Sequence, residues 1–234
     1  MRIIFSAMAL VTLAGVAVPA DAATRNFGIN GFDRIRVDGP FRVKLTTGVA
    51  PFAKATSISA SALDGLAIEV QGRTLIIRSS RQSWGGYPGE SAGPVEITIG
   101  THELTAAALN GSDTLEIDKL RGLSFELGVH GSGAARVGAV EVDQFKVAIS
   151  GTAAASLAGT AKKLTAYVLG VSTLQATELS SKDATLTAAG PATLRATVTE
   201  TAKISVQGPS TVELAGSPAC TVRASGSANV TGCR

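Results

Sequence analysis

The sequence predicts an all-β chain wound as a single-stranded parallel β-helix (a solenoid), with about 18–20 residues in each coil. Three observations lead to this prediction. A glycine recurs at nearly constant spacing through the second half of the chain. The residues on both sides of it alternate between apolar and polar. The composition is rich in glycine and small or β-branched residues and only 4% aromatic, which is typical of many short strands.

The recurring phrase places an apolar or small residue two positions before the glycine, and Ser, Thr or Pro shortly after it. The marker glycines are spaced by 20, 20, 19, 20, 18 and 18 residues: Gly111, Gly131, Gly151, Gly170, Gly190, Gly208 and Gly226. Seven copies at such regular spacing indicate a repeat architecture.

The alternation around each glycine has a period of two, as in strands with one buried face. Leu127 and Val129 precede Gly131, and Ala135 and Val137 follow it. Two strands per repeat leave no room for the helix of a leucine-rich repeat. A β-sandwich or up-and-down barrel is the rival prediction, but neither needs aligned glycines. In stacked coils equivalent residues form ladders about 4.8 Å apart.

Those ladders give specific contacts to look for. We expect Phe125 and Phe145, each six residues before a marker, to stack one coil apart. One apolar stripe is expected to run through the core: Val129, Ile149, Val168 and Val206.

The chain is expected to form one domain over residues 23–234, with regular repeats at 101–234 and irregular N-terminal coils at 28–100. The phrase around Gly39 is a clear copy of the repeat, and Gly72 marks a looser one. Residues 50–65 are expected to form a turn or a short helix.

Residues 1–22 are predicted to be a secretory signal. Arg2 is followed by an uncharged run to Val18, and the small residues Ala20 and Ala22 fit a cleavage site. The alternative, an uncleaved membrane anchor, needs a span of about 20 residues. No later segment is apolar enough to cross a membrane.

Cys220 and Cys233 are the only cysteines, and both lie near the end of a chain expected to be exported. In an oxidising compartment such a pair forms a disulfide. Free thiols or a metal pair are the alternative, and no other ligands lie nearby in the sequence.

Charge gives no support for nucleic-acid binding. The net charge is +3, and Lys162-Lys163 is the longest basic run.

No catalytic, cofactor-binding or metal-binding residues are predicted. An acid–base site on stacked coils needs carboxylates on neighbouring coils, and the positions one before and five after the glycines lack them. Asp113, Glu116 and Asp118 are the nearest approach to an acidic cluster and are expected to form a solvated edge. His130 and His102 have no Ser or Cys partner in the sequence pattern, so we expect surface histidines.

The irregular stretch 81–94 is the candidate binding loop. Trp84 and Tyr87 stand there among glycines, where they can stack on a sugar or anchor a protein partner. Alternatively, they fold back over an apolar patch or the end of the coil.

Several of these motifs together resemble a known family. The segments that carry the resemblance are Gly28-Ile29-Asn30-Gly31-Phe32, Ile35-x-Val37-x-Gly39, Val43-x-Leu45 and the later Leu-x-Gly-Ser phrases. They are similar to the family labelled putative auto-transporter adhesin, head GIN domain, over roughly residues 28–228. The resemblance implies a right-handed β-helix on a bacterial cell envelope and supplies no catalytic residues.

The sequence therefore predicts an exported, non-enzymatic envelope protein that presents a β-helical surface for binding or adhesion. The periplasm, the outer-membrane surface and the extracellular space all fit. The partner is unknown, with a glycan or a protein of the envelope or extracellular space as candidates, and no cofactor is expected. The alternatives are a carbohydrate-active enzyme (a polysaccharide lyase or hydrolase) on the same scaffold, and a structural periplasmic protein.

Overall fold

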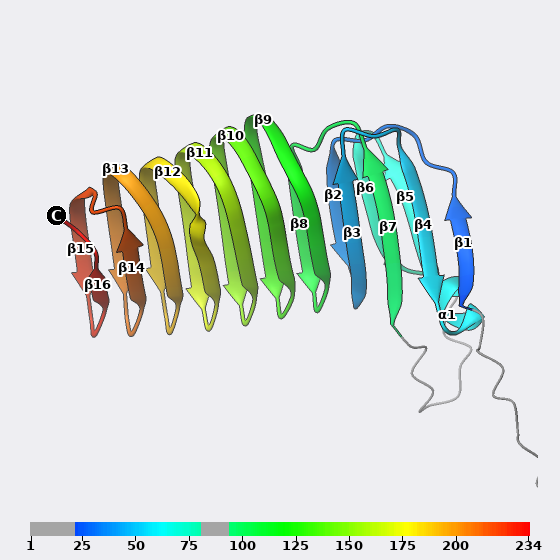
Figure 1. Cartoon of the computed structure of the whole chain (residues 1–234). Coiled ribbons are helices and arrows are strands. Elements are labelled where there is room, and N and C mark those ends of the chain that lie inside the picture. Colours follow the sequence, from blue (N-terminus) through cyan, green and yellow to red (C-terminus); the bar gives the residue numbers. More distant parts are fainter. Residues whose placement is uncertain (1–21, 81–93) are drawn as a thin grey trace, which may run out of the picture.

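The computed structural model describes residues 22–80 and 94–234, and the structural statements below refer to these residues. Sixteen strands join in one continuous sheet that winds into an elongated stack of about six turns (Figure 1). The predicted all-β solenoid is confirmed, and the right-handed sense stays a prediction. The expected signal segment up to residue 21 and the Trp84–Tyr87 loop lie outside the described residues.

The regular part of the stack consists of parallel strands. Each long strand follows most of one coil and pairs with the strands of the coils before and after it, so that Ile149 is the register partner of both Val129 and Val168. The strands are β8 (Ala106–Gly111), β9 (Thr114–Gly131), β10 (Ala134–Gly151), β11 (Ala154–Gly170), β12 (Thr173–Ala189), β13 (Thr193–Gln207), β14 (Thr211–Ala215), β15 (Ala219–Ser225) and β16 (Asn229–Thr231).

The core lies inside the coils and is formed by the alternate positions that precede and follow each glycine. The predicted apolar stripe is confirmed, because its four members are all buried and lie in one column of register partners. The stacking of Phe125 on Phe145 is also confirmed, with ring centroids 5.5 Å apart. Burial of these ladders between neighbouring coils provides the main apolar stabilisation of a solenoid.

The first coil of the stack comes from a distant part of the sequence. β2 (Arg34–Asp38) pairs with β8, and β3 (Phe41–Thr47) pairs with β9. Val37 is thereby in register with Leu109. The phrase around Gly39 is therefore a genuine copy of the repeat, as the sequence predicts.

The segment between these coils forms a cap over the N-terminal end of the stack. It contains β4 (Phe52–Ser57), α1 (Ala60–Asp64), β5 (Leu66–Gln71), β6 (Thr74–Ser79) and β7 (Val95–Thr101), and β1 (Ala23–Phe27) lies outside β4 (Figure 1). Three of its pairings are antiparallel: β1 with β4, β4 with β7, and β5 with β6.

One expectation for this region was wrong, and another was incomplete. Gly72 does not mark a coil corner but lies in a hairpin turn, because Gln71 pairs with Thr74 across two turn residues. The 50–65 segment contains the expected short helix, but strand β4 precedes it. The cap strands β6 and β7 pair in parallel with β2 and β3, and so satisfy the backbone groups at the end of the stack, which otherwise form an open strand edge.

The C-terminal end is closed by a short last coil. β15 pairs with β13 and β16 pairs with β14, and Cys220 and Cys233 form the disulfide that links this coil to the end of the chain. Cys220 packs against the core as the register partner of Ala202.

The corner glycines set how closely the coils approach. Gly131 and Gly151 have φ values of +103° and +99°, which side chains rarely adopt. A Cβ on Gly151 would lie 2.4 Å from the carbonyl oxygen of Gly131 in the coil before. The corner therefore needs glycine for two separate reasons: the backbone conformation, and the lack of space between neighbouring coils for a side chain.

We predict that Gly151→Ala lowers the free energy of unfolding by on the order of 3 kcal/mol, since it adds both backbone strain and a steric clash. Gly72 has a positive φ, but no atom lies within 4 Å of its Cβ position. Gly72→Ala therefore adds backbone strain without a clash and should cost on the order of 1 kcal/mol. Gly31→Ala is the control, because no atom lies within 4 Å of its Cβ position. Urea denaturation measures all three, and equal stabilities of the Gly151 and Gly31 variants would contradict this account of the corners.

Candidate functional site: grooves and rows on the outer faces

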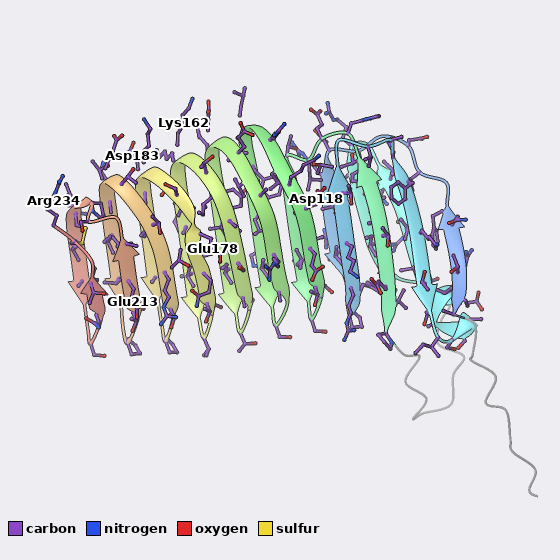
Figure 2. The ribbon with its side chains drawn as sticks, in the orientation of Figure 1. Asp118, Lys162, Glu178, Asp183, Glu213 and Arg234 are labelled. Atoms are coloured by element: carbon purple, nitrogen blue, oxygen red, sulfur yellow. A yellow bond between two sulfur atoms is a disulfide. The ribbon has the colours of Figure 1, made fainter. Side chains whose placement is uncertain are left out.

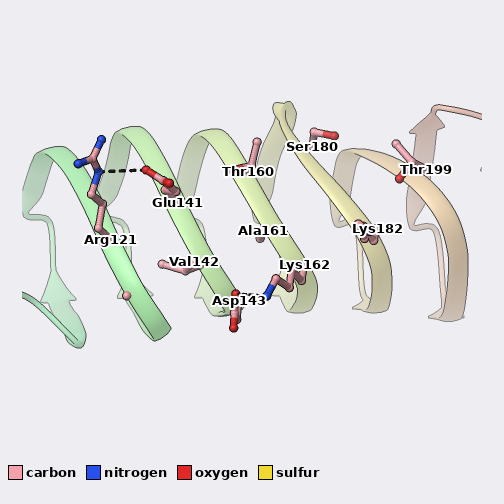
Figure 3. A pocket seen from close by; sticks show the side chains of 11 residues that line it. Arg121, Glu141, Val142, Asp143, Thr160, Ala161, Lys162, Ser180, Lys182 and Thr199 are labelled. Atoms are coloured by element: carbon pink, nitrogen blue, oxygen red, sulfur yellow. Dashed lines mark ion pairs between the residues drawn. The ribbon is translucent and has the colours of Figure 1, made fainter.

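A groove crosses the coils on one side of the solenoid. Its volume is about 690 Å³, and its residues come from five successive coils, β9 to β13. Figure 3 shows Arg121, Glu141, Thr160 and Ser180 along one wall, and Asp143, Lys162 and Lys182 along the other. Val142 and Ala161 lie between the walls. The groove therefore runs along the length of the stack and not around one coil.

The parallel register explains this groove. Gly122, Val142 and Ala161 are register partners and form a floor of mostly small residues. Long side chains stand on both sides of this floor, because successive residues of a strand point in alternating directions. Register shifts in the pairing of β10 with β11 and of β11 with β12 occur at the bends next to the floor. The result is an extended trough open at both ends.

The charges at the groove neutralise one another between coils. Arg121 Nε lies 3.0 Å from Glu141 Oε2, and Lys162 Nζ lies 2.8 Å from Asp143 Oδ1. Lys182 pairs more loosely with Glu200, at 3.6 Å. These exposed pairs each contribute about 0–1 kcal/mol to stability. A charged ligand can therefore replace one partner in such a pair.

The acidic trio predicted as a solvated edge is divided among three environments. Asp113 is buried, and its carboxylate accepts hydrogen bonds from the backbone N–H groups of Gly39 and Asn110, both at 3.1 Å. Asp118 is exposed (Figure 2) and accepts hydrogen bonds from the backbone N–H groups of Thr47 and Lys119. Glu116 alone is an ordinary outward residue. The hydrogen bonds of Asp113 and Asp118 thus link the first coil to the second. The expectation of a solvated edge was wrong for Asp113.

His130 has a hydroxyl partner on the next coil, so the expectation that it has none was wrong. Its Nδ1 lies 2.8 Å from Ser150 Oγ, because the two residues are register partners on adjacent coils. The pair lies on an open strand row at the surface, and His130 is exposed as expected. His102 is exposed just after β7, and its carbonyl accepts the N–H of Gly48.

No three His, Cys, Asp or Glu side chains among the described residues are grouped so that they can hold a metal ion. The described helix α1 is too short to cross a membrane.

A second set of outward residues forms a straight row on another face. It occupies the position three before successive marker glycines, and we call it the tyrosine row: Tyr167, Thr187, Ser205 and Arg223. The sequence predictions concerned the positions one before and five after the glycine, so this row was not predicted. The groove was not predicted for a similar reason, because its walls lie about ten residues from the nearest marker glycine.

The geometry thus defines a β-solenoid with a covered N-terminal end, a disulfide-linked last coil and binding surfaces on its flanks. A family model described as "Putative auto-transporter adhesin, head GIN domain" matches residues 31–218. The chain belongs to this family.

Solved structures share the fold. A putative adhesin from Bacteroides fragilis has a TM-score of 0.79 at 17% identity, covering 90% of this chain and 96% of that one. A putative lipid binding protein from Parabacteroides distasonis has a TM-score of 0.71 at 18% identity, with 91% and 98% covered. A putative adhesin from Parabacteroides merdae has a TM-score of 0.67 at 14% identity, with 91% and 96% covered. No curated protein matches the chain.

The buried carboxyl group of Asp113 predicts a pH dependence of stability. Burial raises its pKa from 3.8 to about 6, although the bonds from Gly39 and Asn110 oppose the rise. The folded protein therefore binds more protons than the unfolded chain between these two values, so stability falls as the pH rises from about 4 to about 6. We expect the loss to be on the order of 2 kcal/mol.

Asp113→Asn should remove this slope, because its amide does not titrate. Asp64→Asn is the control, since that carboxylate is 84% exposed, and it should keep the wild-type slope. The measurement is urea denaturation at pH values from 4 to 7. A wild-type slope that persists in the Asp113 variant would show that another group is responsible.

Proposed function

We propose that this chain is an exported envelope protein that binds extended ligands along its solenoid and so acts in adhesion. The observation that carries the proposal is the groove on β9 to β13, which crosses five coils and presents polar walls over a mostly small floor. A long, open trough accommodates a polymer better than it accommodates a small molecule, because small-molecule sites enclose most of the ligand surface.

Export is part of the same proposal. The disulfide between Cys220 and Cys233 is typical of chains that fold in an oxidising compartment. The signal-like segment 1–22 provides the route, and residues 23–234 then act as one unit. The periplasm, the outer surface and the extracellular space all satisfy these requirements.

Binding without catalysis is the function that the surface supports. The carboxylates at the groove, Glu141 and Asp143, are each held by a cation of the adjacent coil. A glycosidase instead needs one protonated and one free carboxyl group on opposite sides of the scissile bond. The adhesin label of the family and of two of the compared structures agrees with this proposal.

To test it, large side chains can be placed in the groove. Thr160→Trp with Ser180→Trp fills the trough from one wall, and both positions are exposed, so the fold should persist. We expect the labelled full chain to bind isolated bacterial envelopes, and the double variant to lose most of that binding.

Ala134→Trp with Ser156→Trp is the matched control, since both positions are exposed and lie outside the groove. Equal binding by the two double variants would remove the groove from the proposal. Release of new reducing or unsaturated sugar ends during incubation would instead favour the carbohydrate-active enzyme.

A further inference from the structure

The tyrosine row has the features of a binding site separate from the groove. Tyr167, Thr187, Ser205 and Arg223 are successive register partners, so they stand in line along the stack. With strands about 4.8 Å apart, the row extends over roughly 14 Å. A hollow of about 340 Å³ is lined by three of the four, Thr187, Ser205 and Arg223, with Lys203 beside them.

The N-terminal end of the row is an exposed aromatic ring. Tyr167 is 47% exposed, and the two residues before it in the same column, Ala148 and Gly128, are small. The phenol ring is therefore open on the side facing these residues. Aromatic faces of this kind stack on the apolar face of a pyranose ring.

Hydroxyl groups occupy the middle of the row. Thr187 and Ser205 are partly exposed, and their side chains form no hydrogen bond with other described residues. Thr185 and Thr221 border the same hollow. These side chains can both donate and accept bonds, as the hydroxyl groups of a sugar require.

Cations stand at the C-terminal end. Lys203 and Arg223 form no ion pair with any described carboxylate, unlike the cations of the groove. Arg223 offers a planar fork that matches a carboxylate or sulfate. The row therefore carries net positive charge at one end and an apolar platform at the other.

From this arrangement we infer that the tyrosine row binds an acidic linear polysaccharide, with one sugar ring on Tyr167 and an anionic substituent at Lys203 and Arg223. The repeat of an extended pyranose chain is close to the spacing between coils, so successive sugars meet successive residues of the row. A nucleic acid fits less well, because phosphate recognition rests on many cations and this face has few. The inference names a ligand class for one face and rests on the proposed binding function.

The test is isothermal titration of the full chain with oligomers of a polyuronate and with neutral dextran. We expect the polyuronate to bind and dextran to bind far more weakly. Lys203→Gln with Arg223→Gln should weaken polyuronate binding at least about tenfold. Tyr167→Ala should weaken it several-fold, and Tyr167→Phe should preserve it, because the ring and not the hydroxyl makes the contact.

Matched controls separate this site from general charge. Lys54→Gln with Arg136→Gln removes two exposed cations from other faces, and Leu123→Ala removes an exposed apolar side chain outside the tyrosine row. Both should leave binding unchanged. A loss as large in the cation control, or equal binding of the wild type to duplex DNA, would overturn the inference in favour of non-specific attraction.

The outcome also separates the two proposals. If the chain binds envelopes but no acidic polysaccharide, the tyrosine row is not the site and the proposed function stands. If it binds neither, both fail.

Discussion

The structure depends on the close stacking of the corner glycines. Each marker glycine has a backbone conformation with positive φ. Gly131, Gly151 and Gly170 also lie so near the corner before them that a Cβ would be 2.4–2.7 Å from a carbonyl oxygen. The backbone conformation, together with this close approach in the middle coils, fixes the position at which the coils turn. Once the corners are aligned, the strands between them are in register, and the alternation of the sequence places every apolar residue of a column inside or outside together.

The same alignment determines the character of the surface. In a globular domain outward residues that are distant in sequence meet by the particular course of the chain. Here they meet because they hold equivalent places in successive repeats. Ion pairs across neighbouring coils, such as Arg195 with Glu213 at 2.8 Å, follow directly. The groove and the tyrosine row arise in the same way, because each consists of equivalent outward positions in successive coils.

The regular part of the fold was predictable because its signal is repeated. The glycine spacing and the period-two alternation indicated the solenoid, the core stripe and the phenylalanine stack. The N-terminal cap was not predictable in the same way, because it departs from the repeat. The hairpin at Gly72 has a local signal, two β-rich runs separated by two residues, but its glycine also fits the repeat phrase. Whether Gly72 lies in a hairpin or at a corner of a coil depends on which strands form the first coil. That choice involves the pairing of Val37 with Leu109, a contact between segments far apart in the sequence.

The candidate sites show a similar division. The pairing of Cys220 with Cys233 could be inferred from their number and compartment. The burial of Asp113 could not, since it depends on the distant coil that supplies the N–H of Gly39. The contact of His130 with Ser150 follows from the 20-residue spacing, and a comparison of the same column across coils would have found it.

We propose that ligands bind along the flanks of the stack and not at its ends. Hydroxyl-radical footprinting of the full chain, free and bound to envelope material, tests this directly. Exposed reactive residues are available in both regions: Leu123 and Tyr167 on the flanks, Phe52 and Ile58 in the N-terminal cap. Binding along the flanks predicts reduced oxidation of Leu123 or Tyr167 and unchanged oxidation of Phe52 and Ile58. Protection confined to the cap residues would contradict it.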